Sequence, residues 1–166
     1  MKPRVLLLST VHPPTDPRIV SKIAPRLLEE GYAVWVALPG IQAQHVAGSF
    51  GTIRLPSFRL LWVRVFCSFP VVLLRCLPLR PRVVHIFVPE LLPFAWLFRV
   101  LGAEVIYEVQ EDLYKKLPLK RYNNAWLFRV LFRLFDRAAR RCFRIVITEK
   151  AYHKTYSDTR YPPVLV

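Results

Sequence analysis

The chain has 166 residues, of which 25 are Lys or Arg and 11 are Asp or Glu, so its formal net charge at pH 7 is +14. Hydrophobic residues make up 54% of it, which excludes a disordered basic tail, and only 5 glycines exclude a collagen-like chain. The length indicates one domain of ordinary size.

The sequence predicts neither a membrane span nor a secretory signal. The longest nearly uninterrupted apolar run, residues 65–74, is about half of what a bilayer crossing needs. The charged N-terminus leads after a very short apolar stretch into His12-Pro13-Pro14 rather than a cleavage site. Cys67, Cys76 and Cys142 are scattered and lack metal-ligand spacing. We therefore expect reduced, buried thiols in a cytoplasmic protein.

Short β-branched runs alternate with amphipathic stretches in the first third of the chain. Apolar residues recur at helical spacing before Gly31, which suits a helix C-terminal cap. The expected elements are a strand over residues 5–9, a helix over 16–30, a strand over 33–38, and a polar loop over 41–56 that contains a short strand at 52–55.

The same alternation continues to the end of the chain. Residues 59–77 are hydrophobic but are broken by Pro70, and residues 161–166 resemble the start of another strand or linker. The pattern is that of βαβ units, so we predict a doubly wound, Rossmann-like α/β sheet. The remaining expected elements are strands over 83–87, 105–109 and 144–148, helices over 89–101 and 124–142, and a helical turn from Glu149.

Ligands of such sheets bind beyond the carboxyl ends of the strands, so the loops after the strands are the places to search. The loop after the first strand holds His12, Asp16 and Arg18 and has no glycine, which excludes a dinucleotide-binding turn. Asp16 has two interpretations, a helix N-cap or a ligand-binding group. Arg18 lies early in a helix, against the macrodipole, which favours a bound anion or carboxylate.

Carboxylates and two polar groups follow or lie within the later strands. His85 is either a core residue or a site residue, and Glu90 either favours its helix dipole or binds a ligand. Glu108, Glu111 and Asp112, with Gln110 among them, form an acidic cluster. Its alternatives are a site that meets cations or substrate, or a solvated loop balanced by Lys115 and Lys116.

Two basic segments carry most of the excess charge. Residues 58–100 hold six basic groups and one acidic group, and residues 123–166 hold nine and three. Large apolar side chains accompany the arginines, which is typical of a peripheral, anionic membrane surface, although a solvated basic face is the alternative. Nucleic-acid binding is disfavoured because no recognised motif gathers the charge. The candidate membrane-surface residues are Arg59, Arg64, Arg129, Arg133, Arg137, Arg141, Trp62 and Trp126.

Three blocks resemble the N-terminal, acceptor-side domain of family 4 glycosyltransferases of the GT-B fold. Gln110 stands where that family has a His, Glu108 replaces an Asp, and Phe87 and Val88 replace a His and an Asp. The blocks are His12-Pro13-Pro14-Thr15-Asp16-Pro17-Arg18-Ile19 with Gly31-Tyr32-Ala33-Val34, then Val84-His85-Ile86-Phe87-Val88-Pro89-Glu90-Leu91-Leu92-Pro93, then Val105-Ile106-Tyr107-Glu108-Val109-Gln110-Glu111-Asp112.

The resemblance implies a retaining transferase that takes a sugar from a nucleotide-sugar donor. It implies an acceptor-side domain over residues 1–160 and a linker starting at 161–166, with most of the donor bound by a further C-terminal domain or a partner chain. It implies no metal or other cofactor. The expected acceptor is lipid-linked or an envelope polysaccharide, at the inner face of the cytoplasmic membrane. The alternative is a non-catalytic membrane-docking subunit that pairs with a separate donor-binding chain. The implied catalytic residues are Glu108, Gln110 and Glu111, and the implied acceptor-binding residues are His12, Asp16, Arg18, His85 and Glu90.

Overall fold

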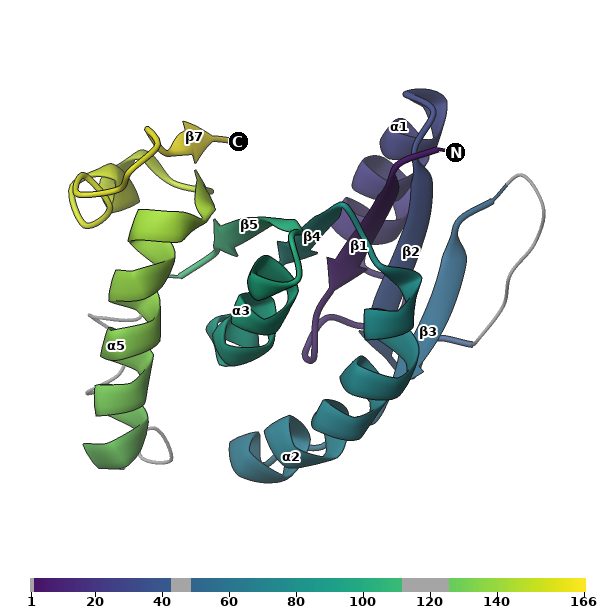
Figure 1. Cartoon of the computed structure of the whole chain (residues 1–166), viewed down its shortest axis with the longest axis horizontal. Helices are drawn as coiled ribbons and strands as arrows, with labels where there is room; N and C mark the ends of the chain where they lie inside the picture. The colour runs from purple at the N-terminus through teal and green to yellow at the C-terminus, as the bar shows by residue number, and fades with distance from the viewer. Residues whose placement is uncertain (1, 43–48, 112–125) are drawn as a thin grey trace.

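The computed structural model describes residues 2–42, 49–111 and 126–166, and its centre is a parallel sheet of seven strands (Figure 1). The strand order is β3-β2-β1-β4-β5-β6-β7, so β1 lies between β2 and β4 and the order reverses there. This doubly wound order confirms the predicted Rossmann-like fold. The strands are β1 (Arg4–Leu8), β2 (Ala33–Pro39), β3 (Gly51–Leu55), β4 (Val83–Ile86), β5 (Glu104–Val109), β6 (Arg144–Ile147) and β7 (Val164–Leu165).

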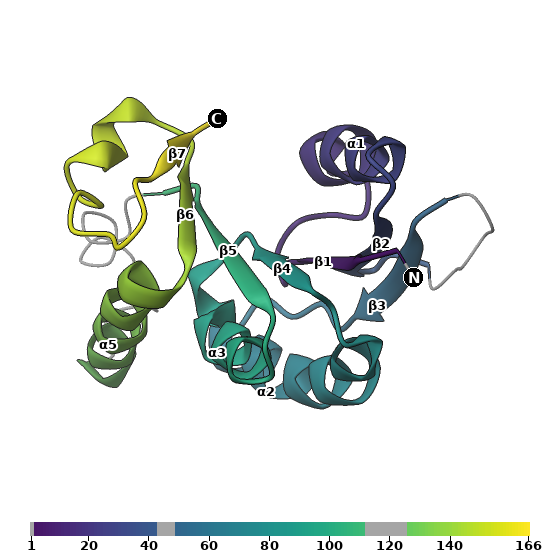
Figure 2. The same cartoon turned by 45° about the horizontal axis from the view of Figure 1, so that its top comes forward.

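Helices cover both faces of the sheet (Figure 2). Because side chains alternate along a strand, Leu6 and Leu8 of β1 enter one core and Val5 and Leu7 enter the other. The second core lies under the π-helical turn η1 (Pro17–Ile23) and α1 (Ala24–Glu29). The first and larger core lies under α2 (Leu61–Val71), the 3₁₀ turn η4 (Pro89–Leu91), α3 (Leu92–Val100) and α5 (Trp126–Cys142).

The hydrophobic stretch around Pro70 is a continuous helix, which corrects the predicted break. α2 passes through Pro70 and is followed directly by a π-helical turn, η2 (Val72–Cys76), and a 3₁₀ turn, η3 (Leu77–Leu79). A wider turn accommodates a residue that has no amide hydrogen to donate. Within the described residues, Leu61–Leu79 is the one helix whose 19 residues are long and apolar enough to cross a membrane. The apolar run counted in the sequence, residues 65–74, is shorter than this helix because Arg64 and Arg75 bound the run.

The C-terminal residues pack onto the domain through α5. Arg140 is buried and donates to Asp136 at 2.9 Å, to Asp158 at 2.6 Å and to the carbonyl oxygen of Thr155. Tyr156 donates its hydroxyl hydrogen to Asp136 at 3.1 Å, and burial raises the pKa of this phenol. The 3₁₀ turn η6 (Lys150–His153) opens this segment, as predicted from Glu149, and β7 closes it against β6.

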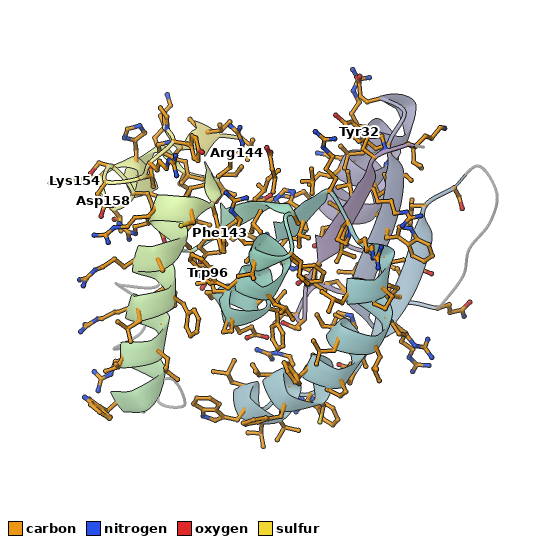
Figure 3. The ribbon with its side chains drawn as sticks, viewed as in Figure 1. Tyr32, Trp96, Phe143, Arg144, Lys154 and Asp158 are labelled. Carbon is orange, nitrogen blue, oxygen red and sulfur yellow. The ribbon has the colours of Figure 1, made fainter. Side chains whose placement is uncertain are left out.

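A second contact joins α3 to the end of α5. The rings of Trp96 and Phe143 lie with their centroids 5.1 Å apart, and both residues are labelled in Figure 3. Arg144, also labelled there, lies with its guanidinium 5.0 Å from the ring centroid of Tyr161. β7 pairs with β6, so the sheet also includes residues 164–165. The predicted start of the long helix at Asn124 lies outside the described residues.

Candidate functional site

The candidate site lies at the carboxyl ends of β1, β4 and β5, beside the point where the strand order reverses. β1 pairs with β2 on one side and with β4 on the other, so the chain leaves these two central strands toward opposite faces. Residues 9–12, 87–90 and 108–111 follow or end the three strands. The sheet therefore gathers them at one edge although they are far apart in sequence.

Glu108 is a buried carboxylate near the end of β5, only 2% exposed. Arg18 donates through Nη1 to its Oε1, and Gln110 Nε2 lies 3.5 Å from the same oxygen. Burial alone would raise the pKa of Glu108, but the contact with and charge of His85, then the charge of Arg18, outweigh it and hold the pKa below its usual value. Glu108 is therefore an anion at neutral pH, held between β4 and η1.

His85 lies beside this carboxylate, and it has features of both predicted roles, a core residue and a site residue. Its Nε2 is 3.1 Å from Glu108 Oε2 but makes no aligned hydrogen bond among the described residues. Its ring stacks on Phe87 with centroids 4.3 Å apart. His85 thus packs as a core residue and also places an imidazole nitrogen against the site's carboxylate.

His12 is held on both ring nitrogens. Ser9 Oγ lies 2.6 Å from Nδ1, and Gln110 Oε1 lies 3.0 Å from Nε2. With the carbonyl oxygen of Gln110 facing the ring, Nε2 carries the hydrogen and the Ser9 hydroxyl donates to Nδ1. The edge of the imidazole also meets Phe87, at 5.9 Å between centroids. Two contacts thus link the segment after β1 to the end of β5, His12 to Gln110 and Arg18 to Glu108. The contacts of Ser9 with His12 and of Gln110 with Glu108 connect side chains within each segment.

Asp16 and Arg18 have different roles in the structure, one as a helix cap and the other as the partner of a carboxylate. Asp16 caps η1, because its Oδ1 accepts from the amides of Arg18 at 3.0 Å and Ile19 at 3.1 Å. Arg18 meets a carboxylate, as its position in the helix indicated, and that carboxylate is Glu108. Its side chain is 38% exposed, so a phosphate or hydroxyl group can still reach the guanidinium from solvent.

Glu90 is clamped rather than open. Arg64 Nε and Nη2 each lie 2.5 Å from one of its carboxylate oxygens, and Thr10 donates to it as well. The Arg64 side chain points into the protein and is mostly buried, so it is unavailable to lipid headgroups. The prediction that Arg64 is a membrane-surface residue is therefore wrong. The fork-shaped guanidinium matches the carboxylate bidentately. This clamp ties α2 to the loops after β1 and β4.

The two described members of the predicted acidic cluster, Glu108 and Glu111, differ in burial. Glu108 is buried and paired, whereas Glu111 is half-exposed at the end of the strand. Asp112, Lys115 and Lys116 lie outside the described residues. Where residues are described, no three His, Cys, Asp or Glu side chains come together as metal ligands.

The other predicted surface residues keep an outward position with one exception. Arg59, Trp62, Trp126, Arg133, Arg137 and Arg141 are exposed. Arg129 is half-buried and has a contact of its own. Sequence reasoning missed Ser9, Thr10 and Phe87, although Ser9 and Thr10 follow a buried strand directly and the same search of strand ends finds them.

Comparisons with known proteins place the fold. No family model and no curated protein matches the chain. Among solved structures, sucrose-phosphate synthase from Thermosynechococcus elongatus matches with a TM-score of 0.67 at 12% identity, over 99% of this chain and 48% of that one. A second structure of the same synthase matches with a TM-score of 0.64, also at 12% identity, over 99% of this chain and 87% of that chain. The chain thus spans about half the length of the first, and the likeness confirms the Rossmann-like fold.

Proposed function

We propose that this chain is the acceptor-side domain of a retaining glycosyltransferase that transfers a sugar from a nucleotide donor. The observation that carries the proposal is the network of His12, Gln110, Glu108 and Arg18 at the reversal of strand order. It holds an amide and a guanidinium against one ionised carboxylate, and an imidazole against that amide, at the edge where open α/β sheets bind ligands. Such groups orient sugar hydroxyls and phosphates through hydrogen bonds.

Each group has a separate role in this proposal. The exposed part of Arg18 binds a phosphate or hydroxyl of the substrate, and Glu108 keeps the guanidinium in place. Ser9 fixes the orientation of His12, whose ring borders the acceptor together with Gln110. His85 and Glu90 hold the neighbouring side chains in position without contacting the substrate, since both are largely buried against other side chains. Glu111, half-exposed beside Gln110, faces the donor sugar.

The rest of the proposal concerns the reaction partners. The nucleotide sugar is bound mainly by a further C-terminal domain, and the acceptor is lipid-linked or an envelope polysaccharide at the inner face of the cytoplasmic membrane. The likeness to sucrose-phosphate synthase supports the fold of such a half-enzyme, and the site residues support the acceptor side.

The test is a transfer assay on the protein joined to whatever sequence follows residue 166 in its gene. We expect radiolabelled sugar to pass from one of a panel of nucleotide-sugar donors to extracted membrane lipid or polysaccharide. His12→Ala and Arg18→Gln should lower this transfer at least tenfold. Lys2→Gln should leave it unchanged, because Lys2 is exposed at the amino end of β1, whereas the site lies at the carboxyl ends of the strands. Absence of transfer from every donor would contradict the enzymatic proposal.

A second candidate is the non-catalytic docking subunit, and Gln110 favours it. An amide cannot carry a proton as an imidazole does, and here the Gln110 side chain already contacts both His12 and Glu108. If this candidate is correct, transfer will require a separately encoded donor-binding chain, which should co-purify with the protein. A stop codon directly after Val166 supports it, and an open reading frame supports the longer enzyme.

A further inference from the structure

The helix from Leu61 to Leu79 is apolar on the side that faces away from the sheet as well as on the buried side. Leu61, Ser68, Val72 and Cys76 face the sheet and are buried. The outward side carries exposed large apolar groups, with Phe66 at 71% and Leu74 at 75%. The other exposed apolar residues of this outward face and its approach are Phe58, Leu60, Trp62, Val63 and Phe69. A helix that is apolar all round requires cover on both sides, and here the protein supplies only one.

The helix nevertheless cannot cross a bilayer in this fold. It connects β3 to β4, and both strands belong to the same sheet through β2 and β1. A spanning helix would place its two flanking strands on opposite sides of the membrane and separate them. The outward face therefore suits a layer that contacts it from one side only, as an interfacial helix does.

The positive charge around this helix indicates which kind of surface would cover its outward face. No Asp or Glu occurs from residue 50 to residue 89. Exposed arginines flank the apolar face at Arg59, Arg75, Arg80 and Arg82, while the remaining arginine of the helix, Arg64, is used inside by Glu90. Trp62 and Phe66 lie with ring centroids 6.5 Å apart, and aromatic side chains of this kind favour the headgroup boundary. Arginines beside an apolar face complement anionic headgroups above acyl chains.

We propose that the outward face of residues 58–74 is the surface by which this protein binds an anionic lipid bilayer. The face lies beside the candidate site, because Arg64 of the same helix contacts Glu90, which follows β4. The amino ends of α2 and α5 both lie at the lower edge of Figure 1. Trp126, at the start of α5, is also exposed.

The Arg64 clamp connects this surface to the site. The same helix that carries Trp62 and Phe66 outward holds Glu90 and, through it, Thr10 on its inner side. Binding of the outward face therefore sets the orientation of the loops after β1 and β4 relative to the membrane. This step rests on the proposed function and gives it a substrate class: an acceptor whose sugar or phosphate headgroup projects from the bilayer.

The experiment is co-sedimentation of the purified chain with vesicles, with no sugar donor present. The vesicles are pure phosphatidylcholine or contain one quarter phosphatidylglycerol, each at low salt and at about 0.5 M NaCl. We expect binding to the anionic vesicles at low salt. The double variant Trp62→Ser, Phe66→Ser should weaken it by roughly tenfold or more, and Arg59→Gln by about fivefold.

The matched control is Val164→Ser, Val166→Ser, in and directly after β7. Val164 is 58% exposed and Val166 is 69% exposed, and β7 is the edge strand at the opposite end of the strand order from β3, which leads into α2. Their variant should bind as the parent does, and circular dichroism should show all variants folded. Equal binding of the two double variants, or no binding to anionic vesicles, would overturn the proposal.

One further result would assign the face to another occupant, and two others separate this inference from the proposed function. Sedimentation equilibrium that finds a dimer abolished by Trp62→Ser, Phe66→Ser would give the face to a second copy of the chain. Vesicle binding without sugar transfer would leave this inference standing while the proposed function fails, and transfer without vesicle binding would do the reverse.

Discussion

Arg18 and Glu108 form an ion pair across 90 positions of sequence, between the first helical turn and the fifth strand. The carboxylate is almost fully buried and the guanidinium is partly open to solvent. One end of the pair thus belongs to the core and the other to the candidate site. Its contribution to stability and its contribution to binding are therefore separable by experiment.

Glu108→Gln should destabilise the protein at neutral pH by about 1–3 kcal/mol, because it removes a charged hydrogen-bond acceptor from Arg18. The folded-state pKa of Glu108 lies below its usual value. The stabilisation is therefore fully present above the unfolded-state pKa of about 4.3 and fades as the pH falls through the folded-state pKa. Urea unfolding at pH 7, 5 and 3.5 should show the difference between parent and variant shrinking with acid.

A matched control for this prediction is Glu29→Gln, which breaks only the exposed pair of Glu29 with Arg26. It should change the free energy of unfolding by less than about 0.5 kcal/mol at every pH. A difference for Glu108→Gln that stays constant from pH 7 to pH 3.5 would show that the charge of the carboxylate contributes nothing.

Arg140→Met should cost about 3 kcal/mol, because it leaves Asp136 as a buried charge without its main partner. Asp158→Asn removes the second carboxylate partner of Arg140. Because Asp158 is exposed, this variant should cost less than about 1 kcal/mol. The pKa of Asp158 is lowered chiefly by its hydrogen bond from Arg140. Urea unfolding of both variants at pH 7 measures the contrast, and equal losses would refute it.

Gly51→Ala should destabilise the edge strand β3 by about 1–3 kcal/mol. An added Cβ at this position would lie 2.6 Å from the ring of Trp35 on the paired strand β2. In a protein that already carries Trp35→Leu, the change Gly51→Ala should cost less free energy of unfolding than it does in the parent. Thermal unfolding of the four proteins in this cycle tests the clash, and additive losses would argue against it.

Cys76 should resist alkylation while the protein is folded. It is fully buried in the larger core, and burial raises the pKa of its thiol to about 12, so almost no thiolate exists near pH 8. Cys67 and Cys142 are half-buried and should react faster with iodoacetamide. Peptide mass mapping before and after unfolding in urea follows each site, and modification of Cys76 at the rate of the others would contradict the packing of η2.

The strands were predictable because strands buried on both faces are nearly continuous apolar runs. Residues 83–86 and 105–109 are two such runs, and their expected bounds differ from the observed ones by one residue at most at each end. Pro70 misled the reading of α2, since a proline usually ends a helix whereas here the turn widens after it. β7, with two paired residues, lies within residues 161–166, where the sequence left open the start of a strand or a linker.

The site was predictable as a set of residues but not as a set of contacts. The rule that ligands bind beyond parallel strand ends singles out His12, Arg18, Glu90 and Gln110 from sequence alone. It does not say that Gln110 meets His12 or that Glu90 meets Arg64. On a helix with apolar residues all round, such as α2, periodicity does not reveal which arginine faces inward.

The central position of β1 has a consequence for the order of folding. β1 comes first in the chain yet pairs with β2 and β4, and the contact of His12 with Gln110 spans 98 positions. Long loops must close before such contacts form, and chains dominated by distant contacts fold slowly. We expect each half of the sheet to gain structure before the imidazole, amide and carboxylate meet, so that ligand binding reports completion of folding rather than collapse.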